Sequence, residues 1–226
     1  MSKQNYLFEG FPAGLPDFLW GLAFNNEKNW FDAHREEYER CLRRPFTALA
    51  EECQAELNRE YSDAFPGLHI SRINRDARRL HGRGPYKDHL WFTLGQTSAL
   101  YAPEPRFWFE IGSHSYGCGL GYFHADAALS QSWRDFLDKN PKKAEKLIRQ
   151  FNRQDNFTHY GRLYNRPKGD PGPLLYDWYN TRDLGFEHTG WFEPDSVPGP
   201  ELKEELLSGF RSLMPFYELF RTLSLS

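Results

Sequence analysis

Short apolar segments separated by glycine and proline occupy the middle of the chain, and they restrict its fold more than any other feature. Four of them are rich in aromatic and branched residues, which predicts β-strands. They are HISRIN (69–74), LWFTLG (90–95), RFWFEIG (106–112) and SYGCGLGYF (115–123). Short connections favour antiparallel neighbours, because a parallel crossover needs about a dozen residues or more. The sequence therefore predicts a mostly antiparallel sheet.

Apolar residues at helical spacing flank this region on both sides. Helices are predicted over residues 16–24, after an N-cap at Asn29 through residue 42, and from Pro45 to about Tyr61. The remaining predicted elements are helices capped by Asp126 and by Asn140, strands within 156–164 and 184–192, a loop over 166–173, and helices over 201–207 and 215–223. Helices, then a sheet, then helices favour one α+β domain over residues 1–226, with the helices packed on the sheet.

Bulk properties exclude several classes of protein. The chain has 226 residues and a net charge of −3, so no global basic field attracts nucleic acid or anionic lipid. No apolar run is long enough for a signal peptide or a membrane helix. The three cysteines are odd in number and form no C-x-x-C pair, which favours reduced thiols. We expect a soluble cytoplasmic protein without a membrane partner.

A basic run, RINRDARRLHGRGPYKDH (72–89), stands out in this slightly acidic chain. Between Arg72 and Lys87, six cationic residues stand against one acidic residue, Asp76, which gives a local charge of +5. They are Arg72, Arg75, Arg78, Arg79, Arg83 and Lys87. If a strand covers residues 70–76, Arg72 and Asp76 point to one face and Arg75 to the other, so some guanidinium groups are expected to be partly buried. A buried guanidinium requires a carboxylate or an anionic ligand, because desolvating it unpaired costs several kcal/mol.

The second half of the run predicts a turn suited to an anion. Gly82 and Gly84 let the backbone approach a ligand, and Arg83 and Lys87 add positive charge. The spacing of a Walker A loop is absent. In the alternative interpretation the arginines pair with carboxylates of the acidic C-terminal third. Those carboxylates are Glu193, Asp195, Glu201, Glu204 and Glu205.

Several motifs along the chain suggest a family. They are FEGF (8–11), FLWGLAFNNEKNWFDAHREEY (18–38), Pro45, RINRDAR (72–78), PYK (85–87) and RPKG (166–169). In these motifs the chain resembles the domain of unknown function 2461 family, a conserved hypothetical group found largely in bacteria. The resemblance spans most of the chain and implies an α+β fold without an established activity. The chain departs from the family where aromatic-Ser and Asp-Lys usually follow the middle motif, since Arg79-Leu80 and Gly82-Arg83 stand there.

Other catalytic and cofactor motifs are missing from the sequence. No two histidines have the spacing of a metal site, and GCGLG (117–121) lacks the dinucleotide-binding spacing, so we predict no metal and no cofactor. Such glycines more often mark a bulge or a close backbone crossing, and they fit equally well as the floor of a pocket beneath Tyr122 and His124. His34 shares a helix face with aromatic residues, which is typical of packing. The pair Asn25-Asn26 fits either a helix end or a ligand contact.

We predict that the basic run and the RPKG loop bind a small anionic or phosphorylated ligand. The predicted ligand-binding residues are Arg72, Arg75, Asp76, Arg78, Arg83, Tyr86, Lys87, Arg166 and Lys168. If catalysis follows, proton transfer falls to Asp76, His81 or Tyr86. Two alternatives stay open: an interaction module for a protein or single-stranded nucleic acid, and a purely structural arginine network. The net charge argues against nucleic acid. Enzymatic activity and oligomeric state stay open.

Overall fold

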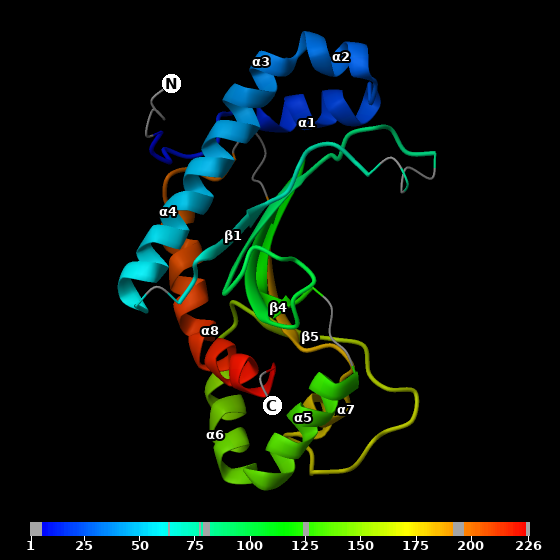
Figure 1. The fold of residues 1–226 in the computed structure, drawn as a ribbon, viewed down its shortest axis with the longest axis vertical. Helices are drawn as coiled ribbons and strands as arrows, with labels where there is room; N and C mark the ends of the chain where they lie inside the picture. The colour runs from blue at the N-terminus through cyan, green and yellow to red at the C-terminus, as the bar shows by residue number, and fades with distance from the viewer. Residues whose placement is uncertain are drawn as a thin grey trace. The chain divides into compact units, whose positions relative to one another are not determined.

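Six strands form one antiparallel sheet in the order β1-β2-β3-β4-β6-β5 (Figure 1). This computed structural model describes residues 6–62, 64–76, 78, 82–123, 127–191 and 197–224. The strands are β1 (Gly67–Ile70), β2 (Leu90–Gly95), β3 (Pro105–Ile111), β4 (Ser115–Tyr122), β5 (Thr158–Tyr160) and β6 (Gly185–Trp191). The predicted α+β class is confirmed.

The helices come before, between and after the strands. They are α1 (Leu15–Phe24), α2 (Lys28–Ala33), α3 (Arg35–Tyr38), the π-helical turn η1 (Glu39–Arg43), α4 (Arg44–Glu60), α5 (Ala127–Lys139), α6 (Pro141–Phe151), α7 (Tyr176–Asn180) and α8 (Leu202–Ser224). None of these described helices has the length and apolar character needed to cross a membrane.

The chain divides into two compact units whose segments alternate along the sequence. The first unit consists of residues 1–98, 108–118 and 189–208, and the second of residues 99–107, 119–188 and 209–226. Strands β3, β4 and β6 and helix α8 each contribute residues to both units. The single domain over residues 1–226 stays a prediction, and each unit is described by itself below.

In the first unit, α4 covers one side of the strands. Figure 1 shows α4 beside β1, and the fully buried Phe46 of α4 packs its ring 5.5 Å from Phe92 of β2 and 5.9 Å from Phe109 of β3. The preceding residue, Trp91, stacks on His69 of β1, with the two ring centres 5.3 Å apart. The period-two alternation of β2 therefore separates a buried aromatic face from a half-exposed one.

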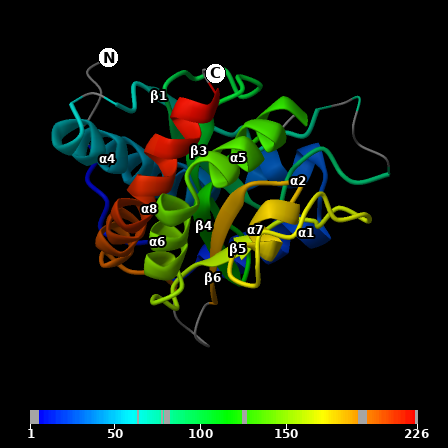
Figure 2. The ribbon, with the colours of Figure 1, turned by 90° about the horizontal axis from the view of Figure 1, so that it is seen from below.

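In the second unit, aromatic rings build the core. Phe186 of β6 is fully buried and packs 4.5 Å from Phe216 of α8 and 4.8 Å from Phe151 of α6. Trp133 of α5 donates its indole N–H to the Trp178 carbonyl of α7 at 2.7 Å. Figure 2 shows α5, α6 and α7 close together in this unit.

The largest differences from the sequence predictions lie in two helices. The helix predicted through residue 42 is interrupted at His34, whose N–H is shared between the carbonyls of Trp30 and Phe31, and its N-cap is Glu27 rather than Asn29. The two predicted C-terminal helices are one helix, α8, which contains Pro215. Its buried residues continue on both sides of the proline, so packing outweighs the helix-breaking tendency.

Helix caps and cysteines complete the comparison. Asn140 occupies the N-cap of α6 as predicted, but its side chain donates to the Phe136 carbonyl at 3.1 Å. Asp126, the other predicted cap, lies outside the described residues. The three cysteines are free and buried.

Candidate functional site

The described residues of the basic run form no strand. Strand β1 ends at Ile70, so the predicted continuation of the strand through the arginines is wrong. Beyond β1 the chain folds back on itself: Asn74 and Tyr86 form an isolated antiparallel bridge, and the Arg75 N–H donates to the Pro85 carbonyl at 2.7 Å. The strict alternation of a strand therefore does not decide which arginines are buried.

Asn26 holds the returning arm of the run in place. Its side-chain carbonyl accepts the Tyr86 N–H at 2.9 Å, and its amide donates to the Tyr86 carbonyl at 3.0 Å. A Cβ at Gly84 would collide with the Asn26 side chain, so glycine permits this close approach. Asn25 instead donates to the Gly21 carbonyl at 2.9 Å and closes α1. The two neighbouring asparagines thus have different structural roles.

Two arginines of the run form pairs within it. The Arg75 side chain is 17% exposed, donates from Nε to the Tyr86 carbonyl at 2.8 Å, and lies 3.6 Å from Asp88. Arg78 is 89% exposed and pairs with Asp76 at 2.8 Å. Both arginines pair with carboxylates, as in the structural-network alternative. The carboxylates are Asp88 and Asp76, however, and not residues of the C-terminal third.

Other residues of the predicted network lie elsewhere. Glu201 accepts the N–H of Gly199 at 2.9 Å. Arg83 is exposed and follows Gly82, which has a φ of 79° in an open turn. Residues outside the described part of the chain are Arg79, His81, His124, Glu193 and Asp195.

Three arginines from separate parts of the sequence line one cavity in the first unit. Its volume is about 240 Å³. The arginines are Arg35 of α3, Arg43 of η1 and Arg72, which follows β1. The other lining residues are Phe31, Tyr38, Ile70, Ser71, Ile73, Asn74 and Tyr86. The cavity therefore contains two predicted site residues, Arg72 and Tyr86.

The positive charge of this cavity is only partly neutralised. Arg35 pairs with Asp32 at 2.8 Å and lies over the Phe31 ring at 5.5 Å. Arg43 and Arg72 form no ion pair with any residue in the described ranges. Guanidinium groups at one concave surface with a single carboxylate among them favour an anionic ligand.

Two tyrosines add neutral hydrogen-bond donors. Burial raises the pKa of Tyr38 to about 12, with the nearby Arg43 opposing the shift. Burial also raises the pKa of Tyr86, together with the charge of Asp32, while Arg35 opposes it. The Tyr86 ring stacks on Phe31 at 4.2 Å, which fixes its orientation. Both hydroxyls stay protonated at neutral pH and can donate to an anion.

One family model matches the chain over residues 15–219, and its description is conserved hypothetical protein (DUF2461). The chain belongs to the DUF2461 family. The match includes every residue of the cavity and confirms the resemblance inferred from the sequence motifs. No curated protein matches the chain.

A π-helical turn separates two of the cavity residues in this DUF2461 chain. Tyr38 ends α3, and η1 follows directly and ends at Arg43. A π turn holds more residues than an α turn, so it rotates the side chains that follow relative to a continuous α-helix. Arg35 and Arg43 were not predicted as site residues, because no pattern within residues 30–43 marks either a helix break or a cavity.

Lys87 is not among the residues that line the cavity. Its Nζ is 5.6 Å from the centre of the Trp91 ring. Burial lowers the pKa of Lys87 to about 8, with Glu110 opposing the shift and Arg75 adding to it. The predicted site residue Lys87 therefore has an unusually acidic ammonium group.

Lys87→Met is expected to raise the free energy of unfolding by about 1 kcal/mol at pH 7. The folded chain holds this proton less tightly than the unfolded chain, whose lysine has a pKa near 10.5. The charged ammonium group of Lys87 therefore destabilises the fold fully below about pH 8, and this effect fades as the pH rises to 10.5. Urea unfolding at pH 7 and pH 10, with the exposed Lys28→Met as control, measures it. A variant no more stable than the parent at pH 7 would contradict this expectation.

The remaining predicted residues have other surroundings. Arg166 and Lys168 belong to the second unit, where Arg166 is exposed and Lys168 lies 4.7 Å from the centre of the Tyr164 ring. His34 stacks on Trp30 at 3.9 Å, which supports a packing role. In the described ranges, no three His, Cys, Asp or Glu side chains are arranged to hold a metal ion.

Proposed function

We propose that the protein binds a small anionic or phosphorylated ligand in the 240 Å³ cavity of its first unit. The convergence of Arg35, Arg43 and Arg72 on this cavity carries the proposal. Guanidinium groups bind phosphate and carboxylate oxygens through paired hydrogen bonds. Ligand pockets for drug-sized molecules measure roughly 300 to 1,000 Å³, so the cavity volume favours a ligand smaller than those.

Tyr86 is the best supported of the three proton-transfer candidates. It lines the cavity, whereas Asp76 is engaged by Arg78, and His81 lies outside the described residues. Its raised pKa makes the hydroxyl a donor rather than a base at neutral pH. We therefore propose ligand binding as the function of this cavity and assign no reaction to it. The free buried cysteines support a cytosolic location.

Arg72→Gln is expected to weaken the binding of inorganic phosphate about tenfold to a hundredfold, because a charge-assisted hydrogen bond contributes about 1.5 to 3 kcal/mol. Arg72 is exposed and has no ion pair among the described residues, so the variant should fold normally. Arg44→Gln is the matched control, since Arg44 is also exposed but does not line the cavity. Isothermal titration calorimetry gives the dissociation constants.

Equal affinity of the parent and of Arg72→Gln would overturn this proposal. A single-stranded oligonucleotide in the same assay tests the interaction-module alternative. Binding of that polymer would weaken steeply with salt through counterion release. Oligonucleotide binding that Arg72→Gln abolishes, without phosphate binding by the parent, would replace the proposed function with that alternative.

A further inference from the structure

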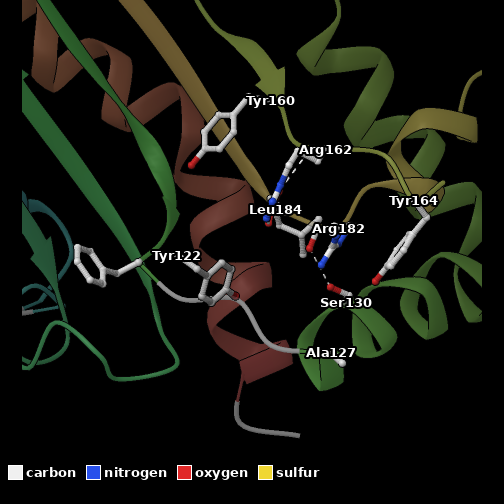
Figure 3. A pocket seen from close by; sticks show the side chains of 10 residues that line it. Tyr122, Ala127, Ser130, Tyr160, Arg162, Tyr164, Arg182 and Leu184 are labelled. Atoms are coloured by element: carbon white, nitrogen blue, oxygen red, sulfur yellow. Dashed lines mark hydrogen bonds and ion pairs between the residues drawn. The ribbon is translucent and has the colours of Figure 1, made fainter. Parts of the chain in front are cut away.

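A second cavity lies entirely within the second unit. It has a volume of about 560 Å³ and lies against the ends of β4, β5 and β6 and the start of α5 (Figure 3). The lining residues are Tyr122, Phe123, Ala127, Ser130, Tyr160, Arg162, Tyr164, Arg182, Asp183 and Leu184. Only one acidic residue stands among them, and Arg162 pairs with it at 3.0 Å.

Glycines shape one wall of this cavity. A Cβ at Gly121 of β4 or at Gly185 of β6 would collide with the Tyr160 side chain. The tyrosine therefore lies directly over the backbones of both strands. Close approach was one of the roles predicted for the glycine-rich segment 117–121. Gly121 has this role, because the Tyr160 side chain lies against its backbone.

Tyr164 is surrounded by positive charge. Its ring centre lies 4.7 Å from Nζ of Lys168, 5.5 Å from the Arg134 guanidinium carbon and 5.9 Å from that of Arg182. Figure 3 shows the Tyr164 hydroxyl pointing toward Ser130, whose own hydroxyl donates to the Arg182 carbonyl at 3.0 Å. Three cations within about 6 Å of one ring concentrate positive charge beside it.

Arg134 supplies the second observation. It is only 7% exposed, and its Nη2 donates to Gln131 at 2.8 Å. Its Nη1 is buried, and no residue of the described ranges accepts a hydrogen bond from it. A buried guanidinium without a carboxylate is costly, so an anionic partner beside Arg134 would remove a large penalty.

Asn180 positions two of these groups. It is 1% exposed, and its carbonyl accepts the Tyr164 N–H at 2.9 Å. Its side-chain oxygen accepts the Lys168 N–H at 2.6 Å, and its amide donates to the Gly169 carbonyl at 3.0 Å. The loop that carries the RPKG motif is therefore anchored with Lys168 next to Tyr164.

The ionisation of Tyr164 agrees with this charge distribution. Burial raises the pKa of its hydroxyl, but donor groups of Arg134 and Ser130 and the charges of Arg134 and Lys168 outweigh burial. The resulting pKa lies below the ordinary value of 10. Burial, together with the charges of Glu187 and Asp183, raises the pKa of Tyr160 to about 12, so the two tyrosines of this cavity have opposite shifts.

We propose that Arg134, Lys168 and Arg182 form a second anion-binding site, in which the Tyr164 hydroxyl contacts a bound phosphate or carboxylate group. Of the three cations, Arg182 lines the cavity, whereas Arg134 and Lys168 lie beside the Tyr164 ring. In the proposed site the anion accepts a hydrogen bond from Nη1 of Arg134, which lacks an acceptor. It also balances a set of cations that has no carboxylate partner within the described ranges. The RPKG motif thus belongs to a site of its own.

When the tyrosines are labelled with ¹³C at Cζ, the Tyr164 resonance reports on this site alone. The Tyr164 resonance is assigned as the one missing from Tyr164→Phe. We expect inorganic phosphate or acetate to shift it saturably, and the better ligand identifies the preferred group. Bound anion should also raise the Tyr164 pKa, because negative charge disfavours the phenolate. A resonance that neither anion moves up to about 100 mM, enough to saturate a millimolar site, overturns the proposal.

Variants connect that response to the cations. Arg182→Gln, at an exposed side chain, is expected to weaken the anion response about tenfold, and Arg134→Met to abolish it. The control is Arg153→Gln, at an exposed arginine in the turn that follows α6, which neither lines the cavity nor lies over the Tyr164 ring. An unchanged response in Arg182→Gln overturns the site even if Arg134→Met does not fold. Because Tyr164 reports only this cavity, the result is independent of the Arg72 experiment.

Discussion

Replacing Asn26 with alanine is expected to lower the free energy of unfolding by about 2 kcal/mol. The variant removes both hydrogen bonds that Asn26 makes to the backbone of Tyr86. Tyr86 is 5% exposed, so its N–H loses its partner where water has little access. Urea unfolding at neutral pH measures the change.

Two other variants control this experiment. Asn25→Ala removes only the exposed bond to the Gly21 carbonyl and should cost about 0.5 kcal/mol. Asn26→Asp keeps an acceptor for the Tyr86 N–H and should fall between the parent and Asn26→Ala. If the alanine variants at positions 25 and 26 are equally stable, the proposed clamp on Tyr86 is wrong.

The same clamp connects stability to the proposed anion cavity. Tyr86 lines that cavity and stacks on Phe31, so release of its backbone should also displace its hydroxyl. We therefore expect Asn26→Ala, under conditions where it is fully folded, to bind phosphate more weakly than Asn25→Ala. Calorimetry on the two folded variants tests this link.

The free energy of unfolding should fall markedly at acid pH because of one largely buried histidine, His159. His159 of β5 stacks on Trp178 at 4.1 Å, and burial lowers the pKa of its imidazole to about 4 from 6.5. The unfolded chain therefore takes up this proton first as the pH falls. Stability from neutral His159 is complete above pH 6.5 and is lost as the pH falls to about 4. The loss should reach about 2 to 3 kcal/mol.

His159→Phe should remove that part of the pH dependence. Phenylalanine keeps a ring against Trp178 and eliminates Nε2, a buried atom without a hydrogen-bond partner in the described ranges. Chemical denaturation between pH 7 and pH 4 measures the slope. His188→Phe, on the neighbouring strand, is the control and should retain the loss. Equal slopes in the parent and in His159→Phe would refute the assignment.

The sheet was more accessible to sequence reasoning than the helices. Strand β2 was predicted with its observed bounds, because aromatic and branched residues end there at a glycine. The break at His34 and the continuity of α8 through Pro215 were missed. Both depend on packing by residues distant in sequence, and local propensity does not contain that information.

The candidate site was predictable only in part, for a similar reason. The density of charge pointed to Arg72, and Tyr86 stood out in the same run. Arg35 and Arg43 join them because three distant segments meet, which no spacing rule describes. Likewise, Lys168 was identified from its motif, but its neighbour Arg134 lies in an ordinary helical pattern.

The alternation of the two units along the chain has a consequence for biosynthesis. Many multidomain proteins fold one domain at a time as the ribosome releases them. Here the first unit needs residues 189–208, and the second needs residues from 209 onward. Neither unit is complete until its last segment leaves the exit tunnel. The nascent chain must therefore keep exposed strands from misassociating until late in translation, and neither unit can be moved to another protein as one contiguous cassette.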